Sequence, residues 1–148
     1  MADIYRNWEH RIIDHFLRNS SQSPPATLWV EIFTALTGDA NYATAVTQAP
    51  AGFGKTGTTT ERPTVAFAAP SAGVTSNTAQ IQWTNASGSS VTPAYIAITS
   101  AAALRTTATD PAVGGSGNLW LVKAYAPGAI ANGATHTVAA GDLTFTLT

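Results

Sequence analysis

The stretch TLWVEIFTAL, residues 27–36, is the point at which apolar residues begin to recur at every second position. One side of an extended segment here carries Leu28, Val30 and Ile32. The opposite side carries Trp29, Glu31 and Phe33. This alternation predicts a β-strand with at least one buried face. Glu31 is the polar exception, and we interpret it as an exposed or edge residue in preference to a catalytic one.

Further segments of the same character follow, and turn-forming residues separate them. They are residues 64–69, 79–84, 94–99, 119–125, 135–140 and 143–148. Roughly seven short strands joined by turns predict a mainly β fold, an antiparallel sandwich or barrel, rather than alternating βαβ units. The region 37–62 is rich in Gly, Thr and Ala and shows no period, so we predict a long loop there with one short strand.

The last strand has the clearest alternation. Its apolar positions, which we expect to face the core, are Leu143, Phe145 and Leu147. The intervening positions, which we expect to face outward, are Thr144, Thr146 and Thr148. A shift of one residue would exchange the two sets, so burial of one face specifies the register.

Upstream of the strands the period is helical instead. Apolar residues recur every four positions as Ile4, Trp8, Ile12 and Phe16. They predict one amphipathic helix over residues 3–18, capped by Asp3 and ended by the prolines of NSSQSPP, residues 19–25. This apolar stripe needs a cover. The cover is either the sandwich of the same chain, which would make the helix a lid, or a neighbouring subunit, and we favour the lid.

Length and composition narrow the class of protein. The 148 residues fit a single domain, 1–148, with the helix at 3–18 and a β-sandwich at 26–148. Charged residues make up 10% of the chain, compared with about 25% in typical domains, and the formal net charge is −1. With no run of Lys or Arg, we expect neither nucleic acid nor a membrane surface as a partner.

Two further features bear on chemistry and location. The chain has no cysteine, which excludes thiol catalysis and zinc sites built from thiolates. The amino terminus lacks the pattern of a signal peptide, and no apolar run reaches the length of a membrane span. We therefore expect synthesis and folding in the cytoplasm.

One motif resembles a nucleotide site. In APAGFGKTGTTT, residues 49–60, the spacing of a P-loop is met by Ala49, Gly54, Lys55 and Thr56. A P-loop binds phosphate through backbone N–H groups at the start of a helix. Here glycine, threonines and Pro63 follow, which are poor helix formers and lead into a predicted strand. We interpret the stretch as a surface loop.

The other candidate residues form no catalytic constellation. His10 and Asp14 lie four apart on the predicted helix, but His15 points elsewhere, and we interpret the pair as solvated. His136 lies in a threonine-rich strand and is interpreted as a surface residue. GGSGN, residues 114–118, is one residue short of a nucleophile elbow. We therefore predict that the protein is not an enzyme and has no catalytic, cofactor-binding or metal-binding residues.

The tryptophans leave a binding function open. They are Trp8, Trp29, Trp83 and Trp120. Exposed aromatic faces would suit sugar rings and form a glycan-binding platform. On the strands of a sandwich, however, tryptophans more often belong to the core or to an interface.

Several blocks occur in an order that resembles a known family. They are NWEHRIIDHFLRN (7–19), GVTSNTAQIQW (73–83), GNLWLVKAYAP (117–127) and VAAGDLTFTLT (138–148). The chain is similar to small virion proteins of tailed bacteriophages, described as tail-fibre, minor tail or head-decoration proteins. The resemblance implies a jelly-roll-like β-sandwich that serves assembly and carries no catalytic residues. Residues 99–118 depart from the family pattern and indicate a protruding loop.

From this resemblance we expect a non-enzymatic structural protein of the virion, assembled in the host cytoplasm. The first expectation is a capsid decoration or cement protein that binds the major capsid protein. Its other partners would be copies of itself, with a trimer as the closed symmetric unit. The alternative is a tail or tail-fibre component that contacts other tail proteins and acts as a receptor- or glycan-binding module.

Overall fold

The computed structural model describes residues 2–4, 6–19, 21, 26–37, 45–48, 52–57, 61–99 and 119–146. For residues 2–4, 6–11, 36–37, 45–48 and 119–120 it describes the backbone alone. Over these ranges the fold is mainly β, with antiparallel strands and one helix, as the sequence predicts. The predicted loop at residues 99–118 lies outside the described residues except for Thr99.

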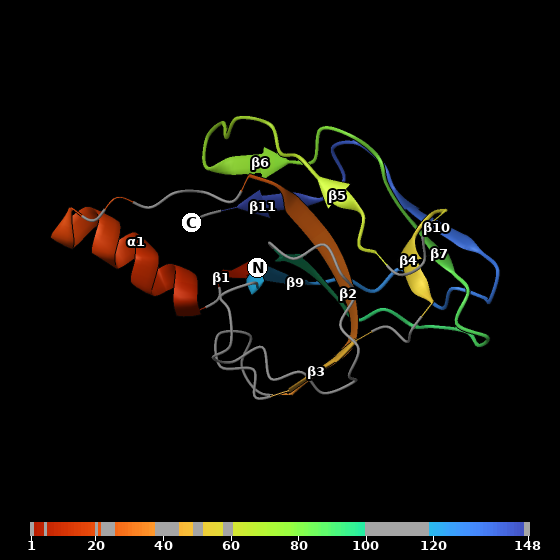
Figure 1. Cartoon of the computed structure of the whole chain (residues 1–148). Helices are drawn as coiled ribbons and strands as arrows, with labels where there is room; N and C mark the ends of the chain where they lie inside the picture. Colours follow the sequence, from red (N-terminus) through yellow and green to blue (C-terminus); the bar gives the residue numbers. More distant parts are fainter. Residues whose placement is uncertain are drawn as a thin grey trace.

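The largest sheet is built around β2. Its strands are β1 (Ala2–Ile4), β2 (Leu28–Thr37), β3 (Ala45–Gln48), β5 (Thr64–Val65), β8 (Tyr95–Thr99) and β9 (Leu119–Ala124). The strand order is β1-β9-β8-β2-β3, and all pairs are antiparallel. The edge of β2 opposite β8 pairs with β5 near its start and with β3 near its end. Figure 1 shows β2 as a long curved strand through the middle of the molecule.

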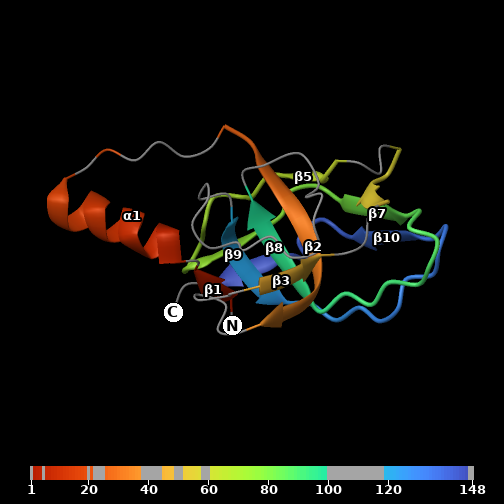
Figure 2. The same ribbon diagram turned by 60° about the horizontal axis from the view of Figure 1, so that its bottom comes forward.

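Two smaller sheets complete the β structure. One has the order β10-β7-β4, with β4 (Phe53–Lys55), β7 (Ile81–Asn85) and β10 (Thr135–Val138). The other pairs β6 (Val74–Ser76) with β11 (Thr144–Thr146). Both views place β7 and β10 at the end of the molecule opposite the helix (Figures 1 and 2).

The core forms between one face of the large sheet and the smaller sheets. Cross-strand pairing places Val30 beside Ile98 and Ile32 beside Ile96, and these side chains pack in one cluster with residues of β7 and β11. The cluster also includes Ile81, Trp83, Leu143 and Phe145, all buried. Thr146 is exposed, so the predicted register of the last strand is confirmed over the described residues. Leu147 and Thr148 lie outside them.

The other face of the large sheet is also covered, which corrects our interpretation of Glu31. Phe33, Ala97 and Val122 are buried there, and Glu31 itself is only 2% exposed. Its Oε2 lies 2.9 Å from Nη2 of Arg62, which is equally buried. The carbonyl of Pro63 accepts a hydrogen bond from the N–H of Val30, at 2.9 Å, and this contact brings Arg62 alongside β2. Glu31 is therefore an interior ion-pair partner and not an exposed or edge residue.

The region predicted as a loop contains two described strands, β3 and β4, where we predicted one. Gly52 precedes β4 with φ +91°, and a Cβ there would lie 2.7 Å from the carbonyl oxygen of Ala86. The glycine thus permits the close approach that starts the β4–β7 pairing. β6 was not predicted. β5 is shorter than predicted because Phe67 pairs with Asn77 instead of continuing along β2.

The helix α1 (Arg6–Arg18) begins three residues later than predicted. Residues 2–4 form β1, where Asp3 lies opposite Val122, so Asp3 does not cap the helix. The helix ends at Arg18, and the next residue, Asn19, has a φ of 52°, the left-handed conformation common just beyond a helix. Figures 1 and 2 both show α1 projecting away from the sheets.

Candidate functional site

The described part of the P-loop-like stretch, residues 52–57, does not have the conformation that binds phosphate. Gly54 and Lys55 belong to β4 and pair with Thr84 and Trp83 of β7. The N–H of Lys55 donates to the carbonyl of Glu61 at 2.7 Å. Successive N–H groups of a strand point in opposite directions and do not converge on an anion. Ala49 lies outside the described residues.

The apolar face of α1, which we define as Ile12, Ile13, Phe16 and Leu17, is open to solvent. Phe16 is 77% exposed and Leu17 is 80% exposed. The polar side of the helix holds an ion pair, with Arg18 Nη1 at 3.2 Å from Asp14 Oδ1. The predicted lid over the same chain's sandwich is therefore wrong for Ile12 and Phe16. The side chains of Ile4, Trp8 and His10 are not described.

His136 belongs to a cluster of rings. This corrects our interpretation of it as a surface residue. The β10–β7 register places it opposite Trp83, and the two rings stack with centroids 6.0 Å apart and planes inclined by 22°. Its Nε2 and the hydroxyl of Tyr125 share a hydrogen bond of 2.5 Å. Both His136 and Tyr125 are partly buried.

Burial favours the neutral forms of His136 and Tyr125. It lowers the pKa of the His136 imidazole, because a charged ring would lose hydration there. Burial, and then the carboxylate of Asp142, raises the pKa of the Tyr125 hydroxyl. The stable pair is thus a neutral imidazole and a neutral phenol that share a hydrogen bond.

The two tryptophans whose side chains are described offer little surface for a sugar. Trp83 is 2% exposed and lies in the core, and Trp29 is partly buried. The side chains of Trp8 and Trp120 are not described.

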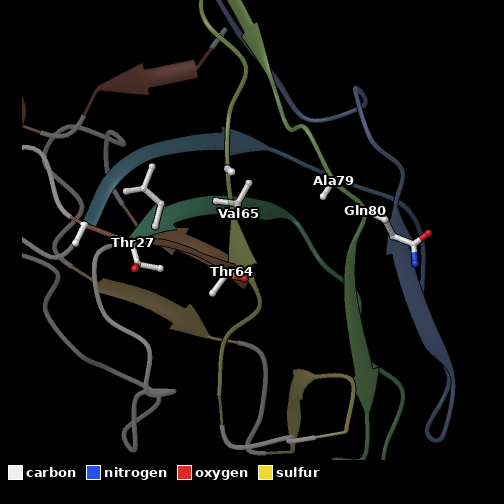
Figure 3. Close-up of a pocket in the computed structure, with 8 residues that line it drawn as sticks. Thr27, Thr64, Val65, Ala79 and Gln80 are labelled. Atoms are coloured by element: carbon white, nitrogen blue, oxygen red, sulfur yellow. The ribbon is translucent and has the colours of Figure 1, made fainter.

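A furrow opens where β5 and β7 diverge, and we call it the β5–β7 furrow (Figure 3). Its main part, of about 550 Å³, is lined by Ala26, Thr27, Leu28, Thr64, Val65, Ala66, Ala79 and Gln80. A smaller hollow of about 200 Å³ adjoins it at Thr64 and Gln80 and reaches Lys55, Thr56 and Gln82. The lining of both parts is small or uncharged apart from Lys55.

Within the described ranges, no group of three or more His, Asp and Glu side chains is placed to hold a metal ion. Among the helices of the same ranges, none is both long enough and apolar enough to cross a membrane.

Comparison with protein families relates nearly the whole chain to a phage protein. The sequence pattern of the family described as Podophage GP4 fiber I protein gp80 matches residues 4–146. The match spans α1 and all strands from β2 to β11. No curated protein sequence matches the chain.

Proposed function

The chain belongs to the Podophage GP4 fiber I protein gp80 family, and we propose that it serves as a non-enzymatic structural subunit of a tail fibre. Membership makes it a fibre- or tail-related structural component of a phage virion. The family description is closer to the tail-fibre alternative than to the capsid decoration role that we expected first. Assembly in the host cytoplasm remains part of the proposal.

The observation that carries the proposal is the exposed apolar face of α1. Burial of each such side chain is worth about 1.5–3 kcal/mol, so Phe16 and Leu17 gain strongly from a protein neighbour. An isolated helix of this length is only marginally stable in water. A subunit that displays this face alone, but covers it in a fibre, would have its attachment surface ready before assembly.

The fold also supports α1 as a connector. β1 pairs with β9 directly before the helix, which fixes the start of α1 to the edge of the large sheet. The helix then projects beyond the sheets, where a neighbour can reach it (Figure 2). We propose that copies meet through the apolar faces of their α1 helices, in a closed symmetric unit such as a trimer. Other tail proteins would bind the assembled unit.

The test is the double variant Phe16→Ser, Leu17→Ser. Both side chains are exposed in the single subunit, so we expect its melting temperature to match that of the wild type within about 2 °C. Sedimentation velocity should show loss of self-association, and phage particles made with the variant should lack the subunit. Asp14→Ala on the same helix is the matched control and should assemble normally. Normal assembly of the double variant would refute the proposal.

A further inference from the structure

One asparagine of this chain is followed by glycine: Asn132 precedes Gly133, and the pair occurs once in the 148 residues. Asparagine is a thermolabile residue. Its side-chain amide can be lost when the backbone nitrogen of the next residue attacks it, and a glycine has no side chain to hinder that attack. Asn132 is exposed, so water reaches the site. The sequence therefore places a chemically labile amide in the turn that leads into β10.

The two residues occupy the centre of an ordered turn. The N–H of Ala134 donates to the carbonyl of Ala131 at 3.1 Å. Gly133 has a φ of +80°, whereas the φ of Asn132 is not positive. A positive φ at the third residue alone is the mark of a type II turn, which favours glycine at that position. The conformation of the labile pair is thus set by the fold.

Both reacting groups are held by hydrogen bonds to the end of β7 and the residues that follow it. The N–H of Gly133, which would supply the attacking nitrogen, donates to the carbonyl of Asn85 at 2.6 Å. The Oδ1 of Asn132, on the amide that would be lost, accepts from the N–H of Gly88 at 2.9 Å. The nitrogen must leave Asn85, and the side chain must swing toward it, before the two can react.

The side chain of Asn85 opposes such an opening. It is buried, and its Nδ2 donates to the carbonyls of Ser89 and Ile130, both at 2.8 Å. Its Oδ1 accepts from the N–H and the hydroxyl of Ser87. Val91 and Ile130 exchange two backbone hydrogen bonds, at 3.0 and 2.8 Å. Because buried polar groups are costly to leave without partners, we expect the turn and the segment after β7 to separate together.

We propose that Asn132 is a deamidation site that reacts only when this turn opens. In the open chain the nitrogen of Gly133 bonds to Cγ of Asn132, and the bond between Cγ and the side-chain nitrogen breaks. Ammonia leaves with the proton of the attacking N–H, and a five-membered imide remains. Water then opens the imide at one of its two carbonyls, which gives either aspartate or isoaspartate.

The isoaspartyl product does not restore the turn. Its main chain runs through Cβ, which adds one carbon between Ala131 and Gly133 and displaces the Gly133 N–H from Asn85. An opening of the turn can therefore become permanent. The turn leads into β10, at the end of the molecule opposite α1 (Figures 1 and 2). The reaction involves a single chain and is independent of the proposed assembly through α1.

Incubation of the full chain, folded in buffer and unfolded in guanidinium chloride at the same pH and temperature, tests the proposal. Peptide mapping by mass spectrometry follows the amide of each asparagine. We expect Asn132 to convert about tenfold faster or more in the unfolded chain, because the folded chain reacts only during local opening.

Two controls accompany this comparison. Asn77, which is followed by Thr78, is the internal control and should stay unconverted in both samples over the same period. Asn132→Gln keeps an amide but would need a six-membered ring, and it should not convert. Equal rates at Asn132 in the folded and unfolded chains would refute the proposal, and so would conversion that spares Asn132.

A pair of glycine substitutions tests the contact from Gly88. Its φ is +87° and a Cβ there would meet nothing within 4 Å, so Gly88→Val strains the backbone without a clash. We expect this strain to loosen the bond to Asn132 and to speed its conversion in the folded chain about tenfold. If the valine prevents folding, Gly88→Ala carries the same test at lower strain, since Ala72 already has a φ of 50°.

Gly141→Val is the matched control. Gly141 has a φ of +90° with open space around its Cβ position, and its N–H donates to the carbonyl of Asn77 at 2.8 Å in a turn of the same kind. Alanine precedes it, so this second turn holds no labile amide. The variant should convert Asn132 at the wild-type rate. Equal rates in Gly88→Val and Gly141→Val would refute the control of the reaction by this turn.

Discussion

Large apolar side chains are buried in the sheets but exposed on the helix α1. In the strands, Val30 and Ile98 are 0% and 1% exposed, whereas Phe16 and Leu17 of α1 are 77% and 80% exposed. The apolar residues of the sheets therefore stabilise the single subunit, and those of α1 do not. We conclude that stability and assembly reside in separate regions of this chain, and substitutions can change one without the other.

The largest expected effect is in the interior of the large sheet. Arg62→Ala would leave the Glu31 carboxylate buried without its guanidinium, which costs about 3–5 kcal/mol of unfolding free energy. Urea unfolding of the purified chain measures this loss. The double variant Glu31→Leu, Arg62→Met removes both charges and should recover most of the stability. A loss below about 1 kcal/mol for Arg62→Ala would show that solvent reaches the pair and that this face is less protected than its burial indicates.

A matched pair of apolar truncations tests the comparison directly. Ile98→Ala should cost about 2–5 kcal/mol, because it opens a cavity in the packed cluster. Leu17→Ala removes a similar volume from an exposed position and should change the unfolding free energy by about 0.5 kcal/mol or less. Self-association should respond in the opposite order. Equal losses of stability in the two variants would mean that α1 packs on the subunit after all.

Most of the fold could be predicted from the periodicity of apolar residues, because the burial of one face of an element imposes that periodicity. Apolar and polar residues alternate in residues 27–36 and 143–146 because one face of each strand packs on the core. This alternation predicts both strands. β3, β4 and β6 have three or four residues each, too few to show a period. Asp3 precedes a helical pattern and is therefore predicted as a cap, but its pairing with β9 overrides that local preference.

The buried polar pair and the ring cluster left weaker signals in the sequence. Glu31 stood out in the sequence, yet its partner Arg62 is distant along the chain, and only the fold joins them. His136 gave no sign that Trp83 and Tyr125 would enclose it. The β5–β7 furrow lies between the points where backbone pairing stops, at Lys55 and Ala66. The sequence does not predict its position, because no particular residue type marks the end of a backbone pairing. The sequence shows the amphipathic pattern of α1. The pattern does not indicate whether the same chain or a neighbouring subunit covers the apolar face.

The smallest expected effect concerns pH and again separates the two regions. Because burial lowers the pKa of His136 in the folded chain, the unfolded chain, with an ordinary value near 6.5, binds the proton more readily. The stabilisation is therefore complete above about pH 6.5 and is lost as the pH falls through that value toward the lower folded one. In the protonated imidazole both ring nitrogens are donors, so Nε2 can then only donate to the Tyr125 hydroxyl. We expect the melting temperature of the wild type to fall between pH 7.5 and 5.5. The melting temperature of His136→Phe, which keeps a ring beside Trp83, should fall less.

The carboxylate of Asp142 and all other groups are common to both proteins, so the difference between their pH profiles isolates His136. Identical profiles would show that the imidazole stays hydrated, and the ring cluster would then belong with the exposed α1 face rather than with the core.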